Sequence, residues 1–378
     1  MSDYFINPYN FVRSERTDNL KKHRPFTHEK FQGQSGRIHC SLKTITRTFI
    51  PDFKTFPGTE KDNTIKHQIC KENTKLPLIP GSSLKGVIRS VAEAVAYGCR
   101  YPTKNDTCSN VNELCICCRI FGMVGKNDTS YAGKVGFNDL MAETENALIE
   151  ETITLKELSA PKPERHTIFY EINRQKLGRK FYYHQPEEYV SKNCSTREGK
   201  RRKTTIKSYI KSNSVFNFTL HFNNLTEEEL GLLLYSLELE KVAVDKKKLE
   251  MHHKIGMAKP LGFGSCELLI TGLELINYEQ RYNNIGSGLE NALNRKRIIK
   301  EYFFDSYFNK NWTEKNTLKN ISDLQKIMSF NGYQVQNIHY PVRDRQNNWY
   351  TNNYDTKLPT IEEVFQNRKM LQEIDEEV

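Results

Sequence analysis

Two segments of this chain alternate apolar and polar residues, and a helical pattern follows each of them. Residues 37–48 (RIHCSLKTITRT) and 214–225 (SVFNFTLHFNNL) have the period of two that is typical of half-buried strands. The second helical pattern opens with Thr226 and Glu229 at capping-box spacing, and another strand is expected over residues 266–275. The predicted order is strand, helix, strands, a long insertion, strand, helix and strand. This order predicts an α+β fold with a ferredoxin-like or RNA-recognition-type core.

The stretch KLPLIPGSSLKGVIRS, residues 75–90, predicts the start of the first helix. Apolar residues recur there at helical spacing, and serine is a good N-cap, so the helix is expected to begin near Ser82 or Ser83 and to end near Gly98. Free backbone N–H groups at a helix start favour anions, and a lysine lies in the first turn. An ordinary strand-turn-helix and a phosphate site both remain open. The candidate phosphate-binding residues are Ser82, Ser83, Lys85 and Arg89.

Most of the net charge lies in one segment. The 378 residues carry a formal net charge of +10, which points towards an acidic partner. Residues 162–211 contain fourteen Lys and Arg against five Glu, with aromatic residues among the bases. Rings can stack on bases while cations follow phosphates, so this long insertion (residues 160–212) suits single-stranded nucleic acid; a solvated charged loop is the alternative. Its candidate RNA-binding residues are Lys162, Arg165, Arg179, Lys180 and His184.

Five cysteines lie within residues 99–118. Cys115 and Cys118 have the C-x2-C spacing that holds one tetrahedral ion, and Cys99 and Cys108 can complete the set, which leaves Cys117 pointing elsewhere. Four thiolates leave no open coordination position, so the expected ion is structural zinc; free thiols in a loop are the alternative. Because the chain shows neither a secretion signal nor a membrane-spanning apolar run, we expect a reducing compartment, the cytoplasm.

The motif KPLGFGS, residues 259–265, comes directly before the last predicted strand. Gly262 and Gly264 either form a tight turn or let a phosphate backbone approach the main chain closely, next to Lys259 and His253. A lone Gly-x-Gly pattern does not decide between these two interpretations.

Several motifs in a fixed order resemble the RAMP superfamily, the repeat-associated proteins of CRISPR effector complexes. They are IPGSSLKGVIRS, CICCRIFG, AGKVGFNDL and HKIGMAKPLGFGS. The opening FINPYNFVR, the KPERH and GRKFYYHQ segments and FNNLTEEELGLLLYSLEL are similar to one type III branch. The resemblance runs from about residue 5 to residue 275 and implies a RAMP-type core over residues 1–275. Residues 276–378 are expected to form a separate C-terminal appendage, with a helix near residues 314–329.

The resemblance implies a guide-RNA-binding backbone subunit of a type III CRISPR interference complex, with guide RNA, target RNA and other effector subunits as partners. The helix start and the glycine-rich loop would hold the guide backbone, and the insertion would act as a thumb between guide and target bases. Such subunits often cut target RNA with one aspartate and a divalent ion such as Mg²⁺. Here the loop before the first helix offers Asp62 and Asp52 as candidates for that endoribonuclease role.

Two other functions compete with this one. The guide-precursor endonucleases of the same superfamily work by metal-independent acid–base chemistry with histidine, for which His253, His184 and His166 are available. A zinc-containing RNA-binding protein outside CRISPR systems is the second alternative.

Overall fold

The structure is a computed structural model that describes most of the chain. It describes residues 6–13, 20–52, 65–99, 107–125, 129–155, 171–172, 175–176, 178–185, 204–240, 242–244, 247–283, 288–330, 338 and 360–364. Four residues named above lie outside these ranges: Asp62, Lys162, Arg165 and His166. The predicted insertion is therefore described only in part.

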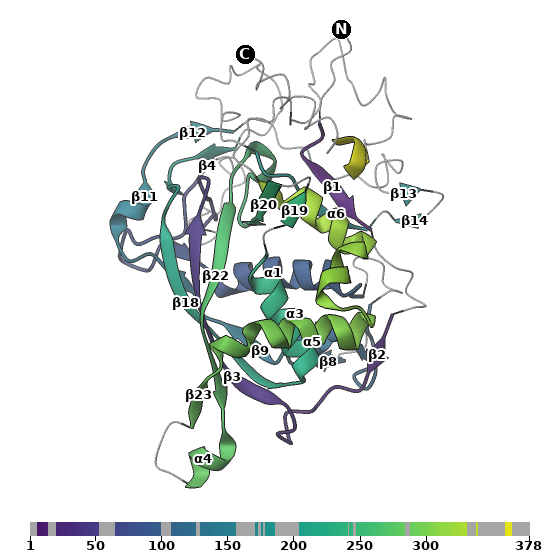
Figure 1. Cartoon of the computed structure of the whole chain (residues 1–378). Helices are drawn as coiled ribbons and strands as arrows, with labels where there is room; N and C mark the ends of the chain where they lie inside the picture. Colours follow the sequence, from purple (N-terminus) through teal and green to yellow (C-terminus); the bar gives the residue numbers. More distant parts are fainter. Residues whose placement is uncertain are drawn as a thin grey trace.

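Three long antiparallel strands form the centre of the fold (Figure 1). β3 (Gln34–Thr44) lies between β22 (Ser265–Ile276) and β18 (Val215–Leu225). The sheet order is β21–β22–β3–β18–β9, and β23 also pairs with β22. The shorter strands of this sheet are β9 (Val135–Phe137), β21 (His253–Lys254) and β23 (Leu289–Asn291).

Alternation along the long strands decides which side chains enter the core. In β18, Phe216, Leu220 and Phe222 are buried, whereas Asn217 and His221 between them are exposed. The three long strands therefore confirm the sequence-predicted strands at residues 37–48, 214–225 and 266–275 over most of their lengths.

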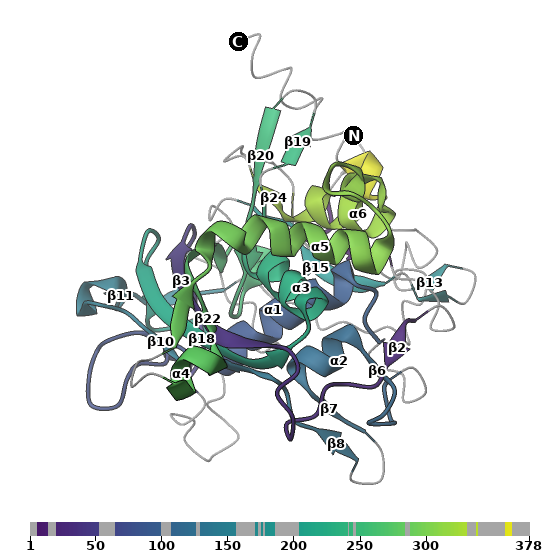
Figure 2. The ribbon, with the colours of Figure 1, turned by 60° about the horizontal axis from the view of Figure 1, so that its bottom comes forward.

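The helices form a layer on the buried side of the sheet (Figures 1 and 2). α1 (Gly81–Val95) packs against α3 (Glu227–Leu237), and α5 (Lys296–Phe308) lies beside α3. α6 (Lys319–Met328) packs against the other end of the helical layer, at α1 and β1 (Tyr9–Val12). Apolar side chains from all of these elements belong to one hydrophobic core.

The first helix begins where it was expected, but the predicted serine cap is wrong. The N-cap of α1 is Pro80, and no side chain caps the helix from that position. Instead, the Gly81 N–H donates to Asp139 Oδ1 at 2.8 Å. The helix ends at Val95, three residues before the predicted end, and Tyr97 follows with a positive φ of 49°. Because the helix starts at Gly81, Ser82 and Ser83 lie inside its first turn and not at the N-cap, and Asp139 satisfies the N–H of Gly81.

The second helix begins at its predicted capping box. The Glu229 N–H donates to Thr226 Oγ1 at 3.1 Å, and the Thr226 N–H donates to Glu229 Oε2 at 3.1 Å. This reciprocal pair satisfies two donors that would otherwise be unpaired at the helix start.

Beyond residue 275, α5 and α6 pack against the core, whereas α4 has no buried residue. Ile299, Phe303 and Phe304 of α5 are buried beside α3. Arg13 Nη2 donates to Asp323 Oδ1 of α6 at 2.7 Å, which joins the N-terminal strand to the C-terminal region. The division at residue 275 into a RAMP-type core and a C-terminal appendage stays a prediction. The predicted helix at 314–329 is divided into a 3₁₀ segment and α6.

Short elements complete the described chain. The paired strands are β1 with β15 (Arg179–Tyr182), β2 (Lys22–His23) with β6 (Leu114–Cys115), β5 (Leu78–Ile79) with β10 (Leu140–Met141), β7 (Met123–Val124) with β8 (Ser130–Tyr131), β11 (Leu148–Ile149) with β17 (Tyr209–Ile210), and β13 (Glu171–Ile172) with β14 (Gln175–Lys176). Two groups of three strands are β4 (Ile65–Lys66), β16 (Thr205–Ile206) and β12 (Ile153–Thr154), and β19 (Val242–Val244), β20 (Lys247–Met251) and β24 (Ser329–Phe330). The remaining helical segments are α2 (Ile116–Phe121), α4 (Tyr278–Asn283), η2 (Glu145–Ala147), η5 (Lys259–Leu261), η6 (Leu293–Arg295) and η7 (Trp312–Thr317).

Among the described helices, none combines the length and the apolar character needed to cross a membrane.

Candidate metal centre and nucleic-acid interface

Four buried cysteines converge on one point. The Sγ atoms of Cys99, Cys108, Cys115 and Cys118 all lie within 4.8 Å of one another, and those of Cys99 and Cys118 are 3.5 Å apart. A tetrahedral zinc ion with Zn–S bonds of about 2.3 Å needs sulfur atoms about 3.8 Å apart. The four residues therefore fit a zinc ion, as their spacing predicts. Such an ion would join segments of the chain, and the full set of thiolates would leave no coordination position for a substrate.

The local fold of the cysteine loop brings these sulfur atoms together. Cys115 ends β6 and Cys118 lies one turn later in α2. The Cys115 N–H donates to Cys108 Sγ at 3.3 Å, a contact that favours a thiolate. Cys117 is also fully buried but is not part of the cluster, and burial raises the pKa of its thiol well above the usual value. The prediction that Cys117 points elsewhere is confirmed.

Glu93 of α1 lies beside the cysteine loop and contacts two arginines. Its Oε1 accepts from Arg89 Nε at 2.8 Å, and its Oε2 lies 2.6 Å from Arg179 Nη1. Arg89 also contacts Cys118 Sγ at 3.8 Å, and Arg179 Nη2 donates to the Cys99 carbonyl at 2.9 Å. Burial lowers the pKa of Arg89, but the charge of Glu93 outweighs this effect and leaves the pKa above its ordinary value. Both arginines were predicted to bind RNA, and here both bind the protein itself.

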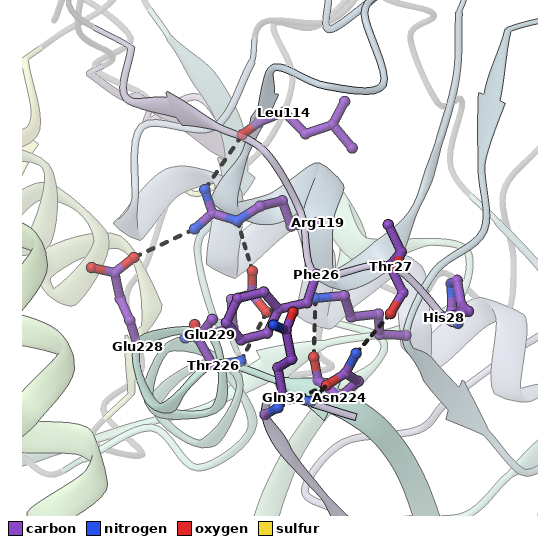
Figure 3. A network of polar contacts seen from close by, with 12 residues as sticks. Phe26, Thr27, His28, Gln32, Leu114, Arg119, Asn224, Thr226, Glu228 and Glu229 are labelled. Atoms are coloured by element: carbon purple, nitrogen blue, oxygen red, sulfur yellow. Dashed lines mark hydrogen bonds and ion pairs between the residues drawn. The ribbon is translucent and has the colours of Figure 1, made fainter. Parts of the chain in front are cut away.

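A second buried network joins the cysteine loop to α3 (Figure 3). Arg119, directly after Cys118, contacts Glu229 Oε1 at 2.7 Å and Glu228 Oε1 at 3.4 Å. Lys134 Nζ lies 3.0 Å from the other oxygen of Glu229, and burial lowers the pKa of this lysine while Glu229 opposes that shift. The sequence predicts Glu229 as a helix cap but not its two cationic partners, Arg119 and Lys134, which lie within the motifs CICCRIFG and AGKVGFNDL.

The remaining residues of the predicted helix-start site differ in exposure. Ser82 is exposed, and Ser83 and Lys85 are half-buried. Lys85 Nζ donates to the Val135 carbonyl at 3.3 Å, and its pKa is lowered by burial and by the nearby charge of Arg89. Of these four residues, Arg89 is the one whose side chain contacts the cysteine loop, at Cys118 Sγ.

The glycine-rich motif forms a tight turn inside the protein. Gly262 and Gly264 have positive φ values of 89° and 81°, and a Cβ at Gly264 would lie 1.9 Å from the Ile255 carbonyl oxygen. Lys254 Nζ donates to the Lys259 and Phe263 carbonyls at 3.0 and 3.2 Å. Burial lowers the pKa of Lys259. The turn itself therefore accounts for both glycines.

Two predicted RNA-binding histidines lie in the interior. His184 contacts Ser265 Oγ through Nδ1 and the His252 carbonyl through Nε2, both at 2.8 Å. His253 Nε2 donates to the Leu237 carbonyl at 2.9 Å, and burial lowers the pKa of this ring to about 4. These hydrogen bonds connect His184 to Ser265 of the glycine-rich motif and His253 to the last residue of α3.

Lys180 lies within an aromatic cluster on the β1–β15 ribbon, which we define as residues 9–12 and 179–182. Its Nζ is 3.6 Å from the centroid of the Tyr9 ring and 4.7 Å from that of Tyr182. Tyr9 and Tyr182 face each other in the strand register. Burial lowers the pKa of Lys180 to about 8. This ribbon contains residues 179–182 of the basic and aromatic segment GRKFYYHQ.

Of the two candidate catalytic aspartates, the structure describes Asp52. It is half-buried, and its backbone N–H donates to the His67 carbonyl at 2.9 Å. Asp62 lies outside the described residues.

Comparison with known protein families places the chain in one of them. The model of the RAMP superfamily matches residues 41–267, which is more than half of the chain. The chain belongs to the RAMP superfamily, which is associated with CRISPR-related RNA-binding proteins. No curated protein matches it.

Proposed function

We propose that this chain is a guide-RNA-binding backbone subunit of a type III CRISPR interference ribonucleoprotein. Family membership supports RNA binding, and the strand order supports a ferredoxin-like core: β3, β9, β18 and β22 are the first to fourth strands of such a unit, and they lie in the order four, one, three, two. The subunit type and the guide are the parts of the proposal that go beyond family membership.

The observation that carries the proposal is the β1–β15 ribbon. It holds Lys180 against the rings of Tyr9 and Tyr182, within a segment that has a large surplus of bases. Tyr9 is buried, whereas Tyr182 and Lys180 are half-buried. The Tyr182 ring can therefore stack on an unpaired base, and the Lys180 ammonium group can contact a phosphate. The ribbon is held by the cysteine loop through Arg179, so its geometry is set by buried contacts.

We assign the guide backbone to the exposed part of the helix start and to this ribbon. Ser82, Ser83 and Lys85 are accessible enough for phosphate contacts, and Lys162 and Arg165 stay predicted contacts of the insertion. The other predicted RNA-binding residues have a structural role in this proposal, because they hold these surfaces in place through contacts inside the protein. They are Arg89, Arg179, His184, His253, Lys259, Gly262 and Gly264.

Purification of the chain with the products of its genomic neighbours, followed by sequencing of the bound RNA, tests the proposal. We expect one RNA population that carries a CRISPR repeat. Lys180→Ala should reduce the amount of bound RNA, whereas Lys75→Ala, which removes an exposed lysine paired with Glu150, should not. Bound RNA without repeat sequence would favour a generic zinc-containing RNA-binding protein, and a complex without RNA would contradict both functions.

Target cleavage is a second part of the proposal and rests on the resemblance. A carboxylate in the loop before α1 would position a divalent ion, because Mg²⁺ prefers hard oxygen ligands. Asp62→Ala should abolish metal-dependent cutting of guide-complementary RNA and leave guide binding intact, with Asp52→Ala as the second candidate. Cutting that survives both changes in the assembled complex would assign the activity to another subunit.

The histidine-dependent endonuclease is the weaker alternative for a structural reason. A general acid or base needs access to its substrate, whereas two of the three candidate histidines, His184 and His253, are buried and hydrogen-bonded to the protein. The third, His166, lies outside the described residues. Cleavage of precursor RNA by the isolated chain in the presence of a chelator would favour this alternative.

A further inference from the structure

A closed ring of contacts links the cysteine cluster to the β1–β15 ribbon. From Cys118 Sγ the contacts pass to Arg89, then to Glu93, then to Arg179, and from Arg179 back to the Cys99 carbonyl. Cys99 and Cys118 are themselves 3.5 Å apart at their sulfur atoms. The ring therefore begins and ends at residues that fit the same metal ion.

Glu93 is the central member of this ring. It is 8% exposed, and each of its carboxylate oxygens serves a different arginine. Arg89 lies on the same helix as Glu93, whereas Arg179 is the first residue of β15. The carboxylate thus joins the helix beside the cysteine cluster to the strand that carries Lys180.

The surroundings of Glu93 leave this carboxylate little freedom. The Gly98 N–H donates to the Glu93 carbonyl at 2.8 Å, and a Cβ at Gly98 would lie 2.8 Å from Glu93 Cγ and 3.0 Å from Cys117 Sγ. The chain therefore turns tightly between Glu93 and Cys99. A metal ion that fixes Cys99 would also fix the position of the carboxylate.

We propose that Glu93 couples the cysteine metal site to the β1–β15 ribbon, so that metal loading positions the ribbon for RNA through Arg179. Glu93, Arg89 and Arg179 are positioning residues in this proposal, and none of them needs to touch RNA. The coupling deepens the proposed function, because its consequence for RNA rests on the ribbon being an RNA-binding surface.

Glu93→Gln is the variant that tests the coupling. It keeps the shape of the side chain, but its amide NH₂ would face one of the two arginines, so one contact of the ring is lost. Glu301→Gln is the matched control, because Glu301 also pairs with an arginine at i,i+4, with Arg297, on an exposed face of α5. Arg179→Lys, which keeps the charge and loses the planar fork, is a second variant that tests the same link.

The first measurement needs no RNA. Hydrogen–deuterium exchange at residues 179–182 of the zinc-loaded protein should become about tenfold faster in Glu93→Gln, the order expected when a charge-assisted contact is weakened. Zinc content should be unchanged in the variant, and Glu301→Gln should exchange like the unmodified protein. Unchanged exchange in both Glu93→Gln and Arg179→Lys would overturn the coupling, whatever the protein binds.

The second measurement uses reciprocity between the two sites. If metal positions the ribbon for RNA, bound RNA must in turn hold the metal more tightly. An oligocytidine RNA should therefore slow zinc release to a colorimetric chelator in the unmodified protein and in Glu301→Gln, but not in Glu93→Gln. Equal slowing in all three would overturn the proposal. Altered exchange in a protein that does not bind the RNA at all would support the coupling and contradict the proposed function instead.

Discussion

Gly231 of α3 lies directly against the backbone of Ile299 of α5. A Cβ at Gly231 would lie 2.4 Å from the Ile299 carbonyl oxygen and 2.7 Å from Phe303 Cβ. α5 can therefore pack closely on α3 because this position of α3 has no side chain.

Replacement of Gly231 by alanine should force α5 away from α3. We expect Gly231→Ala to lower the free energy of unfolding by about 1–3 kcal/mol, the usual cost of overpacking a core. Gly86→Ala is the matched control, since a Cβ at this exposed position of α1 meets no atom within 4 Å. The control should raise the free energy of unfolding by up to about 1 kcal/mol, because alanine favours the helix. Urea denaturation measures both, and an equal gain in stability for both variants would contradict the close packing of α5.

The elements that sequence alone could predict are those with local signals. The alternation of β18 and the capping box at Thr226 and Glu229 lie within a few residues of the structure they determine. The spacing of Cys115 and Cys118 is equally local. Each of these features can be predicted from a short stretch of the sequence.

The features that could not be predicted depend on partners far away in the chain. The first N–H of α1 donates to the distant Asp139, and β1 pairs with a strand from the insertion. Arg89 and Arg179 have the sequence context of phosphate ligands, and only the fold shows that Glu93 lies between them. The sequence around a basic residue does not show whether its partner is a phosphate or a buried carboxylate.

The cysteine cluster predicts one zinc ion per chain. Cys118→Ser should abolish stoichiometric zinc, because Cys118 is one of the four converging sulfur ligands. Cys117→Ser is the control: its side chain is equally buried but lies outside the cluster, so zinc should be retained. Metal analysis of the freshly purified proteins by mass spectrometry decides the matter. Loss of zinc from Cys117→Ser alone would show that the ligand set is wrong.

Burial of His253 predicts a loss of stability in acid. Its pKa is lowered by burial from 6.5 to about 4 in the folded protein, so below about pH 6.5 the unfolded chain binds a proton that the folded chain does not. Stability should therefore fall by about 3 kcal/mol as the pH decreases from about 6.5 to about 4. His253→Gln, which can still donate to the Leu237 carbonyl, should remove most of this slope, whereas His221→Gln at an exposed position should keep it. Urea denaturation at a series of pH values measures the slope, and parallel curves for both variants would contradict the assignment.

Lys180 predicts an unusual pH dependence of RNA binding. Burial lowers its pKa to about 8, so it loses its charge as the pH rises through that value, well before an ordinary exposed lysine would. If its ammonium group contacts phosphate, affinity should fall by up to about tenfold between about pH 7 and about pH 9, because roughly one-tenth of such a group is protonated at the upper end. Lys180→Arg should bind with nearly constant affinity over this range, since the guanidinium stays charged. Fluorescence anisotropy with an oligocytidine RNA, whose bases do not titrate in this range, measures the effect at constant ionic strength. The same decline in both proteins would show that Lys180 is not the titrating contact, and the charge that holds the RNA would then lie elsewhere in the insertion.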